Sequence, residues 1–294
     1  MVGENLRRYL KSILPPLLVN AIASKIYGRI RYQRFNGTWF EASSVCGGYS
    51  NERILTQVAN ATRQVLNGDA KYQRDGVIFH DNSVNWPLVA SVYIAALANP
   101  KGVRVVDVGG GLGSSYHQHA HIISRTQEIH WDIVEQPNFC EFGRGESVLK
   151  DLSFFETLNS YLQEFSPQMA VLSSVLPYVE RPHNMLAELA ASGVSVIFID
   201  RTPLIELEID MLCIQRNPKS IVDSEYPLWL ISRPNLLKDL AEYTLIQEIE
   251  VPGVLKVENF GRSSVFGGIF VRRELVPSIF GPRRTQDGFS RWVE

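Results

Sequence analysis

The sequence predicts an α/β protein with a Rossmann-like, doubly wound and mostly parallel sheet. Two observations predict this fold: short apolar runs alternate with helical patterns after residue 102, and a glycine-rich turn follows the first run. Parallel strands are covered by helices on both faces, so they read as continuous apolar runs. A helical N-terminal region precedes this sheet, and an antiparallel strand closes it near the C-terminus.

The strands and helices of the predicted sheet can be placed in chain order. Apolar runs predict parallel strands at residues 103–107, 129–134, 152–155, 169–172 and 194–199. Helical patterns between them predict helices at 114–126, 139–149, 156–164 and 182–192. Residues 243–251 and 267–273 predict an antiparallel pair of strands, joined by a loop that contains glycine and serine.

The first hundred residues read differently, because helical patterns dominate there. Residues 50–68 and 84–98 each have apolar side chains at helical spacing, and Asn99-Pro100-Lys101-Gly102 ends the second pattern. We therefore predict a helical N-terminal cap at 1–100, a Rossmann-like domain at 101–273 and a C-terminal tail at 274–294.

Composition excludes several classes of protein. The 294 residues have a net charge of −2, which gives no overall basicity to attract nucleic acid. Cys46, Cys140 and Cys213 lie far apart, so neither a disulfide framework nor a zinc knuckle is indicated. His117 and His121 are spaced like zinc ligands on a helix, but no third ligand is visible near them, and we predict no metal site.

The N-terminus is strongly basic. Residues 1–34 carry seven basic side chains and one acidic one, and apolar residues recur there at helical spacing. No run of about 18 apolar residues exists, so a spanning helix is not predicted. Two interpretations stay open: the segment lies on an anionic membrane surface, or its leucines pack on the protein itself. We expect a cytoplasmic protein, with peripheral contact to the inner membrane under the first interpretation.

The glycine-rich turn is the most informative motif. Asp107-Val108-Gly109-Gly110-Gly111-Leu112-Gly113 joins the first predicted parallel strand to a helix. Glycines there let the backbone approach a ligand where a Cβ would collide. In the dinucleotide pattern G-x-G-x-x-G the third glycine would fall on Ser114, whereas acid-x-G-x-G-x-G fits Asp107, Gly109, Gly111 and Gly113. That second form resembles the first motif of class I methyltransferases.

An acidic residue follows at the end of the next predicted strand. Glu135 stands 22 residues after Gly113, where a carboxylate can accept hydrogen bonds from both hydroxyls of a ribose. Dinucleotide-binding folds place an acid at a similar distance, so Glu135 alone does not discriminate between the two ligands. Asp107 does, because a carboxylate before the turn would repel a pyrophosphate and suits the cationic end of S-adenosylmethionine.

Further segments extend the resemblance over roughly residues 10–273. They are Leu14-Pro15-Pro16, residues 37–42, Gly48-Tyr49, Arg74-Asp75-Gly76-Val77, Glu135-Gln136-Pro137, Ser173-Ser174-Val175-Leu176-Pro177-Tyr178, and Ile199-Asp200-Arg201-Thr202-Pro203. Together with the glycine turn they resemble a poorly characterised bacterial family of methyltransferases, whose members tend to be encoded among surface-polysaccharide and lipopolysaccharide genes. The resemblance implies O-methylation of a small molecule or a sugar or glycan hydroxyl, with S-adenosylmethionine as cofactor.

The same resemblance implies roles for individual residues. It places Gly110, Gln136, Phe155 and Ser173 beside the cofactor with the residues already named. An alcohol acceptor must lose its proton, and three side chains are candidates for the base: Asp200, Tyr178 and His80. Arg201, next to Asp200, could instead make that carboxylate half of a structural ion pair. Aromatic residues such as Trp86, Tyr226, Trp229 and Phe260 belong either to an acceptor pocket or to the core.

Two rival functions follow from the same residues. The first is an NAD(P)-dependent oxidoreductase, which the positions of the glycines oppose. The second is a non-catalytic scaffold that keeps the nucleotide fold and docks on a membrane through residues 1–34. The intact glycine turn and Glu135 oppose the second. The sequence predicts no oligomeric state.

Overall fold

The computed structural model describes residues 30–46, 52–123, 128–146, 149–217, 224–258 and 260–281. Residues 1–29, which hold most of the expected membrane-contact segment, and residues 282–294 of the expected tail lie outside these ranges. Within the described ranges, no helix combines the length and the apolar character that crossing a membrane requires.

The five predicted parallel strands form the centre of one large sheet. They are β4 (Val103–Val108), β5 (Ile129–Val134), β6 (Leu152–Phe155), β7 (Met169–Ser173) and β8 (Val196–Ile205). All neighbouring pairs among them run parallel, in the order β6-β5-β4-β7-β8. The order reverses at β4, because the chain builds first toward β6 and then returns to add β7 and β8 on the other side. The predicted doubly wound arrangement is therefore present.

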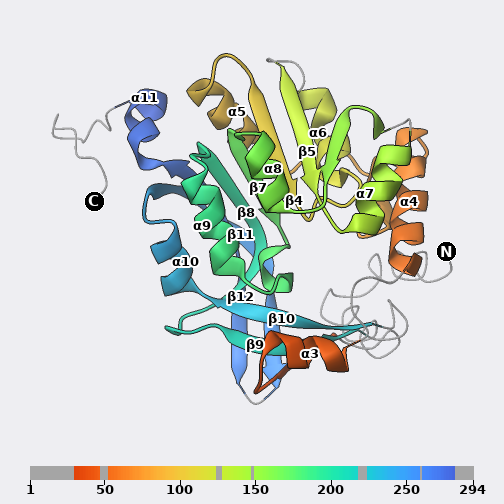
Figure 1. Cartoon of the computed structure of the whole chain (residues 1–294), viewed down its shortest axis with the longest axis vertical. Helices are drawn as coiled ribbons and strands as arrows, with labels where there is room; N and C mark the ends of the chain where they lie inside the picture. The colour runs from red at the N-terminus through yellow and green to blue at the C-terminus, as the bar shows by residue number, and fades with distance from the viewer. Residues whose placement is uncertain are drawn as a thin grey trace, which may run out of the picture.

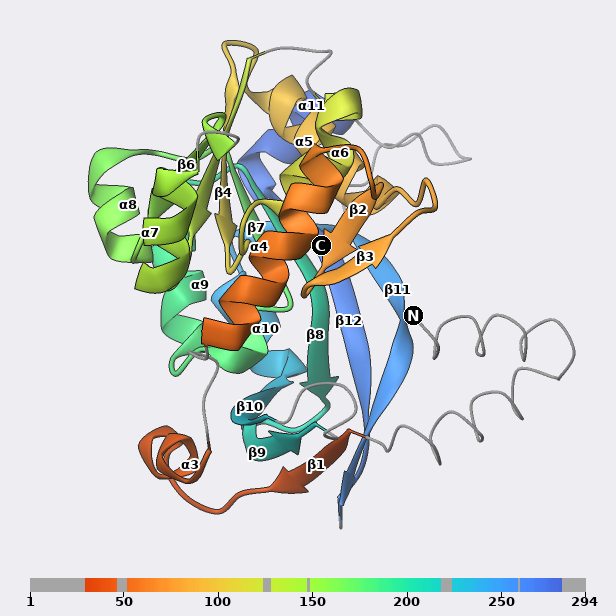
Figure 2. The same ribbon diagram turned by 90° about the vertical axis from the view of Figure 1, so that its right-hand side faces the viewer.

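Helices cover both faces of this sheet, and alternate residues of each strand point to opposite faces (Figures 1 and 2). Val105 and Val171 belong to the core on one face, whereas Val106 and Leu172 belong to the core on the other. The first core includes side chains of α4 (Glu52–Leu66), α5 (Trp86–Ala98), α6 (Ser114–Ile123) and α7 (Pro137–Gly145). The second includes side chains of α8 (Leu158–Glu164), α9 (Pro182–Ala191) and α10 (Arg233–Asp239).

The final two strands are longer than predicted. β11 (Tyr243–Glu258) and β12 (Gly261–Arg272) form an antiparallel pair, and β12 also pairs antiparallel with β8. Most of the expected loop is thus paired strand. A register shift lies between Glu250 and Val254, where the sequence has Pro252 and Gly253. Proline cannot donate to a ladder, and this interruption resembles the end of a strand when only the sequence is read.

The extended ends of these strands take part in a closed barrel, which the sequence did not predict. β1 (Arg31–Arg34) pairs with β11 and β9 (Met211–Arg216), β9 pairs with β10 (Glu225–Ser232), and β10 returns to pair with β8. The ring β8-β12-β11-β1-β9-β10 is complete. Apolar side chains including Met211, Cys213 and Leu228 form the barrel's own core. Part of the expected N-terminal cap, β1, therefore belongs to the main sheet, and it lies with α3 (Trp39–Val45) at the lower end of Figure 2.

A two-stranded hairpin packs beside α4 and α6. Its strands are β2 (Tyr72–Arg74) and β3 (Val77–Phe79), joined through Asp75 and Gly76 in left-handed conformations. At the other end of the chain, η3 (Arg273–Leu275) and α11 (Val276–Phe280) follow β12. Leu275, Val276 and Ile279 pack against the first core, so the expected tail begins with a docked helix. The short helix η2 (Leu176–Tyr178) follows β7.

His183 links α9, α10 and the residue before β9. His183 on α9 donates from Nδ1 to the Asp239 carboxylate at the end of α10, and from Nε2 to Asp210 Oδ2 at 2.7 Å, just before β9. A histidine that donates from both ring nitrogens is protonated. The hydrogen bond to Asp210 is the main cause that raises the pKa of His183 to about 9, with Asp239 adding to it against burial.

We expect this contact to make stability depend on pH in the alkaline range. The raised pKa means that the contribution is fully present below about pH 6.5, the ordinary histidine value, and disappears as the pH rises through about 9. The loss should reach about 2 to 3 kcal/mol in the free energy of unfolding. Urea unfolding at about pH 6 and about pH 10 measures it, and the difference should shrink in His183→Gln. An equal pH dependence in both proteins would contradict this assignment.

Candidate functional site

The candidate site lies at the carboxyl end of β4, where the strand order reverses. Ligands of doubly wound sheets bind in the crevice outside the carboxyl ends of the strands at such a reversal. The glycine turn leaves β4 at this point and enters α6, and the neighbouring strand β5 ends at Val134 in register with Val108. Parallel register thus places Glu135 beside the turn.

The turn depends on glycine at each of its four positions, for different reasons. Gly109, Gly111 and Gly113 have φ values of +72°, +59° and +80°, which side chains disfavour. A Cβ at Gly109 would lie 2.9 Å from Val175 Cγ2, and one at Gly113 would lie 2.3 Å from Leu152 Cδ1. A Cβ at Gly111 would meet nothing within 4 Å. Gly111 therefore presents bare backbone to open space, as a ligand-binding turn requires.

Asp107 supports the turn from beneath. Its side chain is buried, and Trp131 Nε1 donates to its Oδ2 at 3.2 Å. A Cβ at Gly110 would lie 2.7 Å from the carboxyl carbon of Asp107, so the turn rests directly on this carboxyl group. Burial raises the pKa of Asp107 to about 7, opposed by the Trp131 hydrogen bond and increased by the nearby Glu135.

Glu135 faces the turn rather than turning away from it. Its Oε2 accepts from the backbone N–H of Gln136 at 2.6 Å, and the backbone of Gly111 lies near enough to lower the pKa of the carboxyl group. Burial raises the pKa of Glu135, and these two backbone donors oppose the shift. Two carboxyl groups with raised pKa values therefore meet at one turn. A cation bound there would stabilise their ionised forms.

Other predicted cofactor residues lie close in the fold. Gln136 is the N-cap of α7, directly after Glu135. The carbonyl of Phe155, at the end of β6, accepts from Glu135 N at 2.9 Å, and its ring packs against Tyr161 and Phe165. The Ser173 hydroxyl, at the end of β7, is 3.2 Å from Asp200 Oδ2. These residues lie at or directly after the carboxyl ends of β5, β6 and β7.

Of the three candidate bases, Asp200 is the one whose side chain is fixed by other residues at the strand ends. It lies on β8 and is 6% exposed. Its Oδ2 accepts from the Ser173 hydroxyl at 3.2 Å and from Asn85 Nδ2 at 3.5 Å, and Arg201 approaches the same oxygen at 3.6 Å. Within the described part of the chain, Oδ1 has no hydrogen-bond partner. One oxygen is thus anchored and the other is available to a ligand.

Tyr178 and His80 are placed differently. The Tyr178 hydroxyl donates to Gln215 Oε1 at 3.0 Å, and its ring packs edge-on against Tyr226 at 5.4 Å between centroids. Tyr178 therefore joins the polar end of the barrel. His80 is exposed in the segment between β3 and α5. The structure brings neither side chain to the oxygen of Asp200 that is available.

The histidines of α6 have local roles. His119 is buried; Asn85 N donates to its Nε2 at 2.9 Å, and its Nδ1 is 2.8 Å from Ser115 O. In the neutral imidazole, Nε2 accepts and Nδ1 donates, so both ring nitrogens have partners. Burial lowers the pKa of His119, which favours this neutral form. His117 Nε2 is buried without a partner among the described residues. No group of three or more His, Cys, Asp or Glu side chains in those residues is arranged to hold a metal.

The aromatic candidates divide between core and surface. Tyr226 is buried in the barrel, and Trp229 stacks on Trp39 with centroids 5.7 Å apart while its Nε1 donates to Glu180 O. Trp86 is 63% exposed and Phe260 is 36% exposed.

Sequence reasoning missed Asn85 and Arg74. Asn85 caps α5, since its Oδ1 accepts from Leu88 N at 3.2 Å, and it connects α5 to His119 and Asp200. An asparagine before Trp86-Pro87 is a recognisable cap signal, but the contact with Asp200 spans 115 residues and has no local signal. Arg74 at the end of β2 lies within electrostatic range of Asp200 and Arg201.

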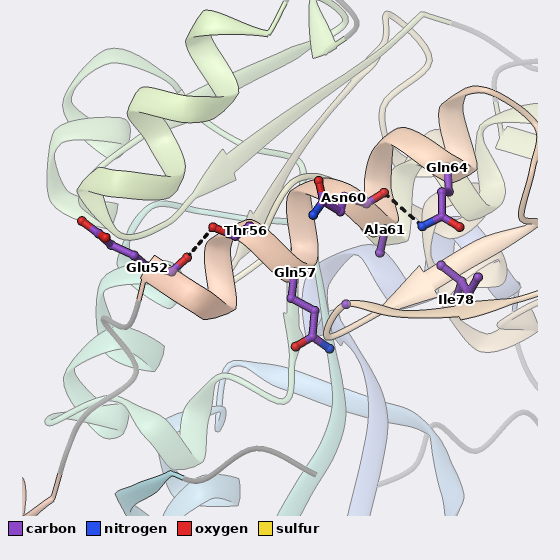
Figure 3. Close-up of a pocket in the computed structure, with 8 residues that line it drawn as sticks. Glu52, Thr56, Gln57, Asn60, Ala61, Gln64 and Ile78 are labelled. Carbon is purple, nitrogen blue, oxygen red and sulfur yellow. Dashed lines mark hydrogen bonds between the residues drawn. The ribbon is translucent and has the colours of Figure 1, made fainter. Parts of the chain in front are cut away.

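A cavity of about 560 Å³ lies elsewhere, between α4 and the β2–β3 hairpin (Figure 3). It is lined by Glu52, Thr56, Gln57, Asn60, Ala61, Gln64, Gly76 and Ile78. None of these residues belongs to the glycine turn or to the strand ends around it. We place the candidate site at the turn, because the bare backbone and the carboxyl groups converge there.

No protein-family model matches the chain, and no curated protein matches its sequence. Among solved structures, the N-terminal domain of EvdMO1 in the presence of S-adenosylhomocysteine and D-fucose is similar with a TM-score of 0.44 and 13% identity, covering 77% of this chain and 100% of that one. An S-adenosylmethionine-dependent methyltransferase from Clostridium acetobutylicum is similar with a TM-score of 0.42 and 7% identity. The match covers 74% of this chain and 98% of that one. CalS10, an amino pentose methyltransferase from Micromonospora echinaspora, is similar with a TM-score of 0.38 and 12% identity, covering 73% and 96%.

Proposed function

We propose that the chain is an S-adenosylmethionine-dependent methyltransferase that methylates a hydroxyl of a small molecule, sugar or glycan. One observation carries the proposal: the bare backbone of Gly111 faces open space, while parallel register places the Glu135 carboxylate beside the same turn. This arrangement lies at the strand-order reversal, where doubly wound sheets bind nucleotides.

The residues of the turn fit an adenosyl sulfonium compound. Glu135 would exchange its backbone partners for the two ribose hydroxyls, which a carboxylate accepts well. Asp107 and Glu135 place two carboxyl groups at the turn, and a cationic ligand would favour their ionised forms whereas a pyrophosphate would oppose them. Gln136, Phe155 and Ser173 would line the same cofactor-binding site. The cofactor would supply a methyl group bound to a positively charged sulfur.

Asp200 is the base that we propose for the acceptor. Ser173 and Asn85 fix its Oδ2, so Oδ1 would accept the proton that the acceptor hydroxyl loses as its oxygen takes the methyl group. Positioning supplies much of the acceleration in such an in-line displacement, up to about 7 to 11 kcal/mol where alignment is good. Tyr178 already donates to Gln215 and His80 is exposed, so neither is preferred.

Calorimetric titration of the full chain tests the proposal. We expect S-adenosylhomocysteine to bind with micromolar affinity and NAD to give no binding heat. Glu135→Gln should weaken S-adenosylhomocysteine binding at least about tenfold, because a neutral amide accepts hydrogen bonds less strongly than a carboxylate. Glu128→Gln is the matched control, since that side chain is 75% exposed and should leave the affinity unchanged.

Two outcomes would reject this function. Binding of NAD without S-adenosylhomocysteine would favour the oxidoreductase, which is the rival enzyme. If neither compound binds, the nucleotide-binding site is rejected and the non-catalytic scaffold is favoured.

A further inference from the structure

Two non-glycine residues with left-handed backbone meet beside the candidate site. Ser174, directly after β7, has φ +62°, and Arg201 on β8 has φ +52°. Each such conformation costs about 1 to 3 kcal/mol and persists only where the surrounding structure enforces it. Ser174 N donates to Asp200 O at 2.9 Å, which joins the two segments.

A β-bulge produces the conformation of Arg201. Ile199 pairs with Gly268 and Thr202 pairs with Phe266, so Asp200 and Arg201 both lie opposite the single residue Gly267. A Cβ at Gly267 would lie 3.1 Å from Ile249 Cβ, which favours glycine there. Bulges of this kind re-aim a side chain. Here the bulge directs the guanidinium of Arg201 toward the end of β7.

The guanidinium of Arg201 is held mainly by neutral groups. It donates to the Ser173 hydroxyl at 2.8 Å and to the Ser174 hydroxyl at 3.4 Å. Its carboxylate neighbour is Asp200 Oδ2 at 3.6 Å, an oxygen that already accepts from two other side chains. The Arg201 side chain is 30% exposed. The guanidinium group is thus fixed in place and partly accessible to solvent.

A second arginine, Arg74, interacts electrostatically with Arg201. The hairpin carries Arg74 next to α6, where it influences His119, and His119 contacts Asn85, which reaches Asp200. Burial and then the repulsion of Arg201 lower the pKa of Arg74, and Tyr72 and Asp200 oppose the shift. Arg74 and Arg201 therefore act on each other electrostatically, and the hairpin that carries Arg74 packs beside α6.

We propose that Arg201 and Arg74 bind an anionic group, a phosphate or a carboxylate, carried by the methyl acceptor. The substrate class is then a phosphorylated or acidic sugar, with its anion at the two arginines and its hydroxyl at Asp200 Oδ1. The planar fork of arginine matches both kinds of oxyanion. This inference rests on the proposed function for the role of the anion, but the anion site itself can be measured separately.

Titration of the full chain with inorganic phosphate and with acetate tests the site, in low salt and with chloride constant. Measurements are made with and without saturating S-adenosylhomocysteine. We expect one of the two anions to bind, phosphate indicating a phosphorylated acceptor and acetate an acidic sugar. Arg201→Gln and Arg74→Gln should each weaken that binding at least about tenfold. Arg144→Gln is the control, because Arg144 lies at the end of α7 and forms its ion pair with Glu156.

The variants also distinguish the possible failures. Arg201→Gln removes hydrogen bonds at a strained bulge, so its folding is checked by circular dichroism, and the more peripheral Arg74→Gln provides an independent measurement. If neither anion binds, or if both variants bind it as the unaltered chain does, the anion site is rejected. If S-adenosylhomocysteine does not bind while the anion does, the proposed function fails and the anion site stands.

Discussion

Replacing Asp200 with asparagine is expected to slow methyl transfer by about 10²- to 10⁴-fold, the usual contribution of a general base. The amide has almost the same shape and can keep the contact of Oδ2 with Ser173. It cannot take a proton from the acceptor. Transfer of a tritiated methyl group from S-adenosylmethionine to an extract of phosphorylated sugars and glycans measures the rate.

Cofactor binding separates this role of Asp200 from a structural one. The affinity for S-adenosylhomocysteine should be unchanged in Asp200→Asn, and so should the midpoint of urea unfolding. Asp151→Asn, at an exposed position before β6, serves as the control. A variant at Asp200 with the unaltered rate would show that its carboxylate only neutralises Arg201, as an ion pair would.

Replacing Gly113 with alanine should be the most destabilising single change in the turn. Left-handed backbone costs alanine about 1 to 2 kcal/mol, and the new Cβ would lie 2.3 Å from Leu152 Cδ1. Overpacking of that kind adds about 1 to 3 kcal/mol. We therefore expect the free energy of unfolding to fall by about 2 to 5 kcal/mol, measured by urea denaturation.

Gly111→Ala is the matched comparison for Gly113→Ala. Its φ is also left-handed, but its Cβ would meet nothing within 4 Å. The loss of stability should therefore stay near about 1 to 2 kcal/mol. Affinity for S-adenosylhomocysteine should fall sharply, because the added methyl group occupies the face that we assign to the ligand. Unaltered affinity in Gly111→Ala would mean that no ligand touches this face.

The parallel strands could be predicted from the sequence because their signals are local. Ile129–Val134 and Leu152–Phe155 have the bounds that their apolar runs predict, since both faces of each strand are covered by helices. β1 could not be predicted, because Arg-Tyr-Gln-Arg has no apolar pattern and is held by pairing with residues about 180 positions away. The barrel depends on such distant pairs throughout.

The candidate site also has one part that local sequence signals predict and one part that they do not. Asp107, the glycines and Glu135 follow a motif with fixed spacing, so the sequence places them together correctly. The contacts of Asp200 and Arg201 depend on a bulge opposite Gly267 and on Asn85 from another helix. Neither the direction of a bulged side chain nor a contact across 115 residues leaves a local pattern.

Closure of the barrel also affects how the protein behaves toward other copies of itself. Open sheets end in strands with unpaired backbone groups, which can recruit strands from neighbouring molecules and begin aggregation. Because β10 turns back onto β8, the barrel end of the described sheet has no free terminal strand, and the opposite end is β6. β6 spans Leu152–Phe155, a segment too short to template extended pairing between chains. Before Val257, β11 pairs with β12 alone in the described sheet, so its other side is where a strand from another molecule could add.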